Sequence, residues 1–320
     1  MQGKIDTHQH VVPPAYRRWL VGQGIDAGGL ALPTWEAGAA TEMMDKLAIR
    51  AGILSVSTPG VHLRGDHPGP DEEARLWARK VNEFAAGVVQ GAPERFGFFA
   101  TLTLPDVDGA LAEAAYALDV LRADGVVLLS SVYGRYLGDP EFAPLFDELN
   151  RRSAVVFVHP SELLAPPVAG VPAFAIDFLL DTTRTALHLA MSGTLTRCPD
   201  MKVILSHGGG FLPYAAQRMS PFAGLGDPTA GLDLLRQFYF DLALSSSPFA
   251  LPSLLAFADP THVTFGSDFP YAPANAYESM MASLEKFPLS GDLRAAIDHG
   301  NAEVLFPRLA RRNLTRFSVS

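Results

Sequence analysis

The chain has 320 residues, 48% of them hydrophobic, so it can bury a large core and fits a single domain over residues 1–320. A formal net charge of -9 and the lack of any basic run disfavour nucleic acid or an anionic membrane surface as partners. Cys198 is the only cysteine, which excludes an intrachain disulfide. Neither a signal peptide nor a membrane-spanning run is visible in the sequence. We therefore expect a cytoplasmic protein.

Short apolar runs that end at Pro, Gly, Ser or His predict strands buried on both faces, as in parallel sheets. In chain order they cover residues 4–10, 51–58, 96–104, 125–131, 154–160, 202–209, 238–244 and 262–270. Helical spacing of apolar residues marks the segments 41–50, 71–89, 106–123, 139–153, 177–198, 248–258 and 292–306. This alternation predicts an α/β fold, a (β/α)8 TIM barrel. A doubly wound open sheet is the alternative, but the Gly-rich phosphate turn typical of its first strand is missing.

Two connections are too long for simple loops and suggest a distorted barrel with insertions. Residues 11–40 follow the first strand and residues 161–176 follow the fifth, and both are rich in Pro and Gly. Both leave the carboxyl ends of strands, where the active sites of barrels lie. We therefore expect them to form lids or walls of a binding site.

Histidines and an aspartate gather at the carboxyl ends of the predicted strands. His8 and His10 are two residues apart on the first strand, so their side chains share a face. His159 ends the fifth strand, His207 the sixth and Asp268 the eighth. A barrel brings these ends around one centre, which predicts a metal site.

Imidazole and carboxylate ligands together suit a first-row divalent ion such as zinc. The fourth predicted strand, 125–131, offers neither a lysine nor an acid that could bridge two metals. We therefore expect one divalent ion per chain.

The remaining histidines are not expected to be ligands. His188 and His299 fall inside predicted helices, and His262 begins the eighth strand at the opposite end of the barrel. His62 and His67 lie in the loop after the second strand and could approach the mouth of the barrel.

Four motifs carry a family resemblance. They are D-x-H-x-H at 6–10, H-P at 159–160, S-H-G-G-G at 206–210 and G-S-D-F-P at 266–270. Together they resemble the amidohydrolase superfamily, and the chain is most similar to its decarboxylase branch, over about residues 4–306. The resemblance implies that the metal ligands are His8, His10, His159 and Asp268, and that His207 is an acid–base residue near the metal. It favours zinc as the metal, with manganese or magnesium as the alternatives. It also implies that Arg218 reaches into a neighbouring subunit and holds a substrate carboxylate, so a homodimer or a higher homo-oligomer is expected.

Three functions are compatible with this site. The first is non-oxidative decarboxylation of a small aromatic, salicylate-like or enol-like acid, in which His207 and Asp268 are catalytic. The second is hydrolysis of a lactone or related ester by a metal-activated water. The third, a non-enzymatic metal-binding protein, is disfavoured because structural zinc sites are usually closed and rich in cysteine. An apolar wall favours the first, and we expect Trp35 to contact the substrate there, with Trp19, Leu30 and Leu32 beside it.

Overall fold

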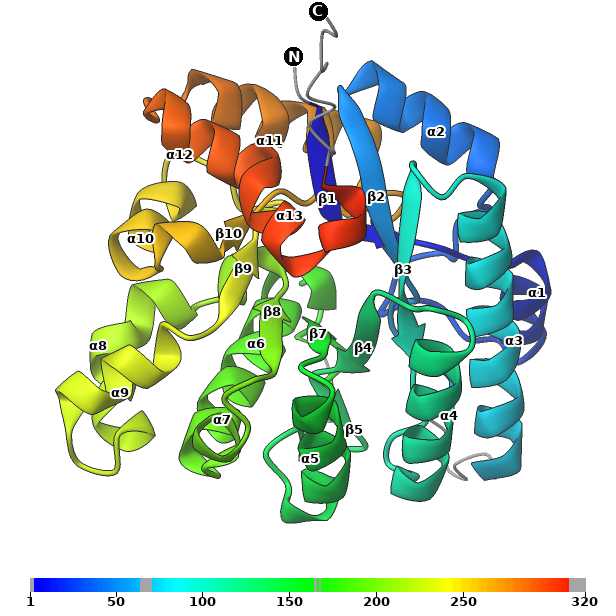
Figure 1. Cartoon of the computed structure of the whole chain (residues 1–320), viewed down its shortest axis with the longest axis horizontal. Coiled ribbons are helices and arrows are strands. Elements are labelled where there is room, and N and C mark those ends of the chain that lie inside the picture. The colour runs from blue at the N-terminus through cyan, green and yellow to red at the C-terminus, as the bar shows by residue number, and fades with distance from the viewer. Residues whose placement is uncertain (1–2, 64–70, 164–165, 167, 311–320) are drawn as a thin grey trace, which may run out of the picture.

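The computed structural model describes residues 3–63, 71–163, 166 and 168–310. Eight parallel strands stand side by side in chain order around a central axis, with helices on the outside (Figure 1). They are β1 (Lys4–His10), β2 (Ile49–Ser55), β3 (Phe96–Thr101), β4 (Gly125–Leu129), β7 (Val155–His159), β8 (Lys202–Leu205), β9 (Tyr239–Asp241) and β10 (Val263–Thr264). The amides of Thr7 and His10 donate to the carbonyls of Phe265 and Phe269, at 2.9 and 2.7 Å, and join the first strand to the end of the last. The predicted (β/α)8 barrel is confirmed.

The helices follow the strands in the expected alternation. They are α1 (Pro14–Gly22), α2 (Ala37–Lys46), α3 (Asp71–Gly91), α4 (Val107–Asp119), α5 (Ala143–Arg151), α6 (Ala173–Met191), α7 (Thr194–Arg197), α8 (Leu212–Ala223), α9 (Pro228–Leu235), α10 (Ala250–Phe257), α11 (Ala274–Lys286), α12 (Gly291–Ala295) and α13 (Asn301–Leu305). A two-stranded antiparallel ribbon, β5 (Ser131–Val132) and β6 (Arg135–Tyr136), follows β4. None of the helices in the described part of the chain is long and apolar enough to cross a membrane.

The long segment after β1 is more regular than expected. It contains α1, which begins at Pro14, where the fixed φ of proline suits the first helical position. The connection after β7 is shorter than expected, because α6 begins at Ala173. The expected helix 292–306 is divided into α12 and α13 by a π-helical turn at Ala296–Gly300.

Helices α8, α9 and α11 were missed by the sequence analysis. Helix α8 contains Pro221, and α11 buries only Met281 and Leu284 among its thirteen residues. Within the described residues all eight strands join one barrel; a single domain over the whole chain stays a prediction.

The amino-terminal half of the barrel interior is a closed apolar core. Ile5, Phe99, Phe157, Ile204 and Tyr239 point inward from five strands and pack with the C-terminal segment at Phe306. Because strand side chains alternate, the next inward positions on the same strands lie nearer the carboxyl ends. On β7 the next inward position after Phe157 is His159, two residues further on, so the core forms the floor of the predicted metal site.

Candidate metal centre and active site

The structure brings the four predicted ligands together. The ligand atoms of His8, His10, His159 and Asp268 all lie within 4.8 Å of one another, and all four residues are buried. His8 and His10 project from β1, His159 ends β7, and Asp268 lies in the loop after β10. His10 Nε2 lies 3.1 Å from both His8 Nε2 and Asp268 Oδ1.

The three imidazoles are held by their Nδ1 atoms. His8 Nδ1 donates to Asp241 Oδ2 at 2.9 Å, and His159 Nδ1 donates to the Pro160 carbonyl at 2.9 Å. His10 Nδ1 lies 3.2 Å from the Ser55 carbonyl. The Nε2 atoms are thereby left for a common centre, which is how metal-binding histidines are usually oriented. This donor set fits one divalent ion.

Asp241 is a functional residue that the sequence analysis missed. Besides His8, its carboxylate accepts from the backbone amides of His207 (3.1 Å) and Ala243 (2.8 Å), and it is fully buried. It lies on β9 two residues after the inward-facing Tyr239, and so shares that face. A carboxylate at an inward position of an otherwise apolar strand was the signal available in the sequence.

His207 stands beside the cluster without joining it. Its ring centroid lies 4.7 Å from that of His8 and 5.8 Å from that of His159, and its Nδ1 faces the Ala243 carbonyl at 3.2 Å. The glycines that follow have positive φ, and a Cβ on Gly210 would lie 2.2 Å from the Leu179 carbonyl oxygen. The three glycines therefore let the chain turn tightly directly after His207.

The loop that carries Asp268 is tied to β1 by Asp6. The Asp6 carboxylate accepts from the Ser267 amide (3.0 Å) and hydroxyl (2.6 Å), and from the His8 amide (3.0 Å). Asp268 itself has a φ of 62°, an uncommon conformation for a residue other than glycine. Such conformations concentrate at functional sites, where the surroundings enforce them.

Burial and neighbouring charges perturb the pKa values of the site in the absence of a metal. Burial lowers the pKa of His8, but Asp241 and Asp268 outweigh it and raise this pKa to about 10. Burial lowers the pKa values of His10, His159 and His207. Burial opposes ionisation of Asp268, yet hydrogen bonds from His10 and His8 hold its pKa well below the usual range. Without a metal the site thus offers the neutral imidazoles of His10 and His159 and one carboxylate, while His8 carries an additional proton that a metal must displace.

A cavity of about 700 Å³ opens above the cluster. His159, His207, Asp268 and Tyr271 are among the residues that line it. Much of the remaining wall is apolar and includes Leu30, Phe174, Phe178, Phe211, Leu244 and Leu254. Among the described residues that line it there is no lysine or arginine. Its size is that of a site for a small organic ligand.

The two expected substrate contacts lie outside this cavity. Trp35 is 5% exposed and packs against Phe84 with ring centroids 6.0 Å apart, away from the described lining of the cavity. Of the predicted apolar wall, Leu30 lines the cavity, whereas Trp19 stacks on Trp77 at 4.6 Å. Arg218 lies on α8 with its side chain exposed. His67 falls outside the described residues.

Residues 5–308 match the model of the amidohydrolase family. The chain belongs to this family. It is 40% identical to a 6-methylsalicylic acid decarboxylase of Penicillium expansum, over 96% of this chain and 97% of that protein. A crystal structure of an amidohydrolase II superposes with a TM-score of 0.88 at 29% identity, covering 95% of this chain and 99% of the other. A dihydroxybenzoic acid decarboxylase from Polaromonas, solved with bound manganese, shares the fold with a TM-score of 0.75 at 22% identity, covering 98% of this chain and all of that one. The resemblance predicted from the four motifs is confirmed.

Proposed function

We propose that the protein is a metal-dependent, non-oxidative decarboxylase of a small aromatic acid that carries a hydroxyl group ortho to its carboxylate. The observation that carries the proposal is the cluster of His8, His10, His159 and Asp268 with His207 beside it, at the base of a largely apolar cavity. The decarboxylase relative that acts on 6-methylsalicylic acid supports a salicylate-type substrate.

His8, His10, His159 and Asp268 would hold the ion. When bound, a divalent ion supplies positive charge that orients and stabilises the oxygens of the acid. Zinc is the proposed metal because three imidazoles and one carboxylate suit it. Manganese is the alternative, since a decarboxylase of the same fold contains it.

The chemistry requires one proton at the ring carbon that bears the carboxylate. The carbon–carbon bond then breaks, its electron pair restores the aromatic ring, and carbon dioxide leaves. We assign proton transfer to His207, whose Nδ1 is held by the Ala243 carbonyl, so that Nε2 is the atom free to take up and release a proton. The Asp268 carboxylate contacts His8 and His10 through Oδ1, and we propose that it also takes part in this transfer.

The apolar walls of the cavity would hold the ring and exclude water. Phe174, Phe178 and Leu254 offer flat or aliphatic surface of the kind that packs on an aromatic ring. Exclusion of water strengthens each electrostatic contact inside the site.

The deciding experiment compares two kinds of product. Protein loaded with zinc or with manganese is incubated with 6-methylsalicylate, other hydroxybenzoates and a set of lactones. We expect equal amounts of carbon dioxide and phenol from at least one hydroxybenzoate, and none from Asp268→Ala protein. Ring opening of a lactone without release of carbon dioxide from any acid would favour the hydrolase instead.

We further propose that the active unit is a homodimer in which Arg218 completes the site of the partner subunit. The described lining of the large cavity contains no cationic side chain, although the substrate is an anion. The part of the chain that carries Arg218 also exposes Tyr214 (86%), Phe222 (58%) and Leu225 (86%), an apolar surface suited to a protein contact. A guanidinium that crosses such a contact could bind a carboxylate with two hydrogen bonds.

Mixed dimers test this arrangement. Arg218→Ala should raise KM while the metal content stays unchanged. Mixing Arg218→Ala chains with Asp268→Ala chains should restore activity, because one site of the mixed dimer keeps its own Asp268 and the partner's arginine. Arg122→Ala, which changes an exposed arginine near the amino end of β4, serves as the matched control. A monomer at working concentration, or no rescue in verified mixed dimers, would refute the shared site.

A further inference from the structure

Tyr271 lies where the metal cluster meets the large cavity. It follows Asp268 by three residues in the loop between β10 and α11, and it lines the cavity. Its ring packs edge to face against the metal ligand His10, with ring centroids 5.2 Å apart and an angle of 80° between the ring planes. The proposed roles of the metal and of His207 do not involve this tyrosine.

The hydroxyl group of Tyr271 has no hydrogen-bond partner among the residues that the structure describes. Its oxygen is also not one of the fully enclosed side-chain atoms that lack a partner, so it keeps surface that a ligand can contact. Tyrosine hydroxyl groups in largely buried positions are usually paired. An unpaired but accessible hydroxyl in the lining of a cavity indicates that a ligand or water completes it.

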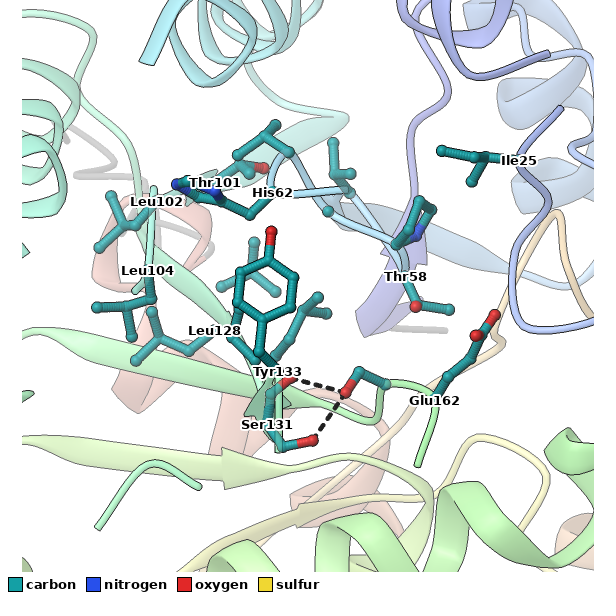
Figure 2. A pocket seen from close by; sticks show the side chains of 18 of the residues that line it. Ile25, Thr58, His62, Thr101, Leu102, Leu104, Leu128, Ser131, Tyr133 and Glu162 are labelled. Atoms are coloured by element: carbon teal, nitrogen blue, oxygen red, sulfur yellow. Dashed lines mark hydrogen bonds between the residues drawn. The ribbon is translucent and has the colours of Figure 1, made fainter. Parts of the chain in front are cut away.

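Two other tyrosines near the mouth of the barrel are paired within the protein. Tyr16 donates to the Gly60 carbonyl, and Tyr133 donates to the Leu63 carbonyl at 3.1 Å. Tyr133 and Gly60 line a smaller cavity of about 250 Å³, beyond the ends of β2, β3 and β4 (Figure 2). Compared with these two, Tyr271 has a hydroxyl group that is available to a substrate in the large cavity.

The surroundings keep the Tyr271 hydroxyl neutral and place it near the metal ligands. A tyrosine has an ordinary pKa of about 10. Burial and the negative charge of Asp268 raise the pKa of Tyr271 further. The proton therefore stays on the oxygen at neutral pH, and the influence of Asp268 shows that this oxygen lies in the neighbourhood of the cluster. A neutral hydroxyl can donate one hydrogen bond and accept another.

This position suits the ring hydroxyl of the substrate better than its carboxylate. The four ligands would hold the ion that binds the carboxylate. In an ortho-hydroxy acid the hydroxyl is on the neighbouring ring carbon, so it comes to lie beside the ligands as well. Tyr271 is both a part of the cavity lining and a neighbour of His10 and Asp268. Two neutral hydroxyl groups can pair in either direction, one donating and the other accepting.

We propose that Tyr271 determines specificity for hydroxybenzoates by pairing its hydroxyl with the ring hydroxyl ortho to the substrate carboxylate. This inference rests on the proposed function, which supplies the hydroxybenzoate. An acid without the ring hydroxyl would displace water from the cavity and leave the Tyr271 oxygen unpaired. Sites that hydrogen-bond a substrate hydroxyl reject such analogues strongly for this reason. Tyr271 thus governs which acid binds, whereas His207 transfers the proton.

Two acids that differ in a single group test the pairing. In 2,6-dimethylbenzoate a methyl group replaces the hydroxyl of 6-methylsalicylate, with little change in shape. Calorimetry measures the binding of both acids to zinc-loaded His207→Ala protein, in which little turnover is expected. In this protein 6-methylsalicylate should bind more tightly than 2,6-dimethylbenzoate. Adding Tyr271→Phe should reduce this preference by roughly 5- to 100-fold, the effect of leaving one polar group unpaired.

The controls separate pairing from packing. Tyr271→Phe keeps the ring against His10, so the metal content should stay unchanged. Tyr277→Phe makes the same change on α11, outside the described lining of the cavity, and should keep the preference for 6-methylsalicylate. If Tyr271→Phe weakens the binding of both acids equally, Tyr271 acts through packing or through the carboxylate, and the proposal is overturned. Equal affinity for the two acids before Tyr271 is changed would overturn it as well.

Turnover in protein that retains His207 gives an independent result. Tyr271→Phe should lower kcat/KM for 6-methylsalicylate by roughly 5- to 100-fold, chiefly through a higher KM, because the pairing is made before the reaction begins. Carbon dioxide release together with an unchanged preference between the two acids would leave the proposed function standing and refute the role of Tyr271. A preference that Tyr271→Phe removes, without carbon dioxide release from any acid, would support this role and refute the proposed function.

Discussion

The two ends of the barrel interior differ sharply although the same strands build both. Near the amino ends the inward side chains are Ile5, Phe99, Phe157 and Tyr239, which pack together and are buried from solvent. Near the carboxyl ends the inward side chains are Thr101 on β3, His159 on β7 and Asp241 on β9. On β1 they are His8 and His10, which follow a shift in strand register between Asp6 and Gln9.

This difference separates stability from function. Burying imidazoles and carboxylates costs free energy unless each is paired or binds a metal. The apolar floor offsets that cost with dispersion contacts and buried area, such as the ring pair of Phe99 and Phe157 at 5.3 Å. We therefore expect changes at the carboxyl end to abolish chemistry and changes at the amino end to reduce stability.

The largest expected effect comes from removal of a ligand. Asp268→Ala or His159→Ala should lose most of the bound ion and reduce turnover by roughly 10²–10⁴-fold, because several kcal/mol of charge stabilisation disappear. Elemental analysis and steady-state kinetics measure the two effects, and circular dichroism should show an unchanged fold. Two ions per chain in the unmodified protein, or full occupancy in both variants, would contradict a mononuclear site.

Changing His207 should separate chemistry from metal binding. His207→Ala should retain much of the metal but lose about 10²–10⁴-fold in turnover, the contribution typical of a positioned acid or base. His207→Asn keeps a polar group of similar size and serves as the control for packing. If His207→Ala loses the metal as completely as His8→Ala, then His207 is a ligand and its assigned role is wrong.

Substitution in the apolar core at the amino ends of the strands should reduce stability and leave metal binding intact. Phe99 is 2% exposed and contacts both Phe157 and Phe306. Phe99→Ala should lower the free energy of unfolding by about 3–5 kcal/mol, as for other buried aromatic residues, while the folded fraction still binds metal. Urea denaturation measures the change, and Val304→Ala, at a position that is 74% exposed, should stay within about 0.5 kcal/mol of the unmodified protein.

The strand pattern brought His207 and the four ligands to one end of the barrel, because each lies near or just beyond the carboxyl end of a strand, and the family resemblance then separated His207 from the ligands. Once eight apolar runs indicate a barrel, His8, His10, His159 and Asp268 must meet at one end, whatever the exact helix boundaries. The same logic extends to Asp241, on the inner face of β9, but its carboxylate lies outside the cluster of four ligands and pairs with His8 Nδ1 instead. Only the contact with His8 reveals its role.

Loops were harder to predict because their positions depend on packing rather than on strand alternation. Trp35 was expected at the substrate, since an apolar residue in a long loop at the mouth could cover it. In the structure it packs against Phe84 of α3 instead, and Leu30 from the same segment reaches the cavity. Composition identified the apolar segment but could not say which of its side chains faces inward.

The smallest expected effect concerns the coupling between Asp241 and the metal. Asp241 and Asp268 raise the pKa of His8 to about 10, so the metal-free site carries a proton on His8 at neutral pH. A metal must displace this proton, and affinity should therefore rise by about tenfold per pH unit between pH 6 and 8, as expected for one released proton. Competition with a chromophoric chelator measures this slope.

In Asp241→Asn protein the neutral amide still accepts from His8 but no longer stabilises imidazolium. The pKa of His8 therefore falls, and the slope of metal affinity against pH should flatten towards pH 8. An equal slope in both proteins would show that Asp241 does not control the protonation of His8, whereas a flat profile in the unmodified protein would show that His8 is neutral before the metal binds.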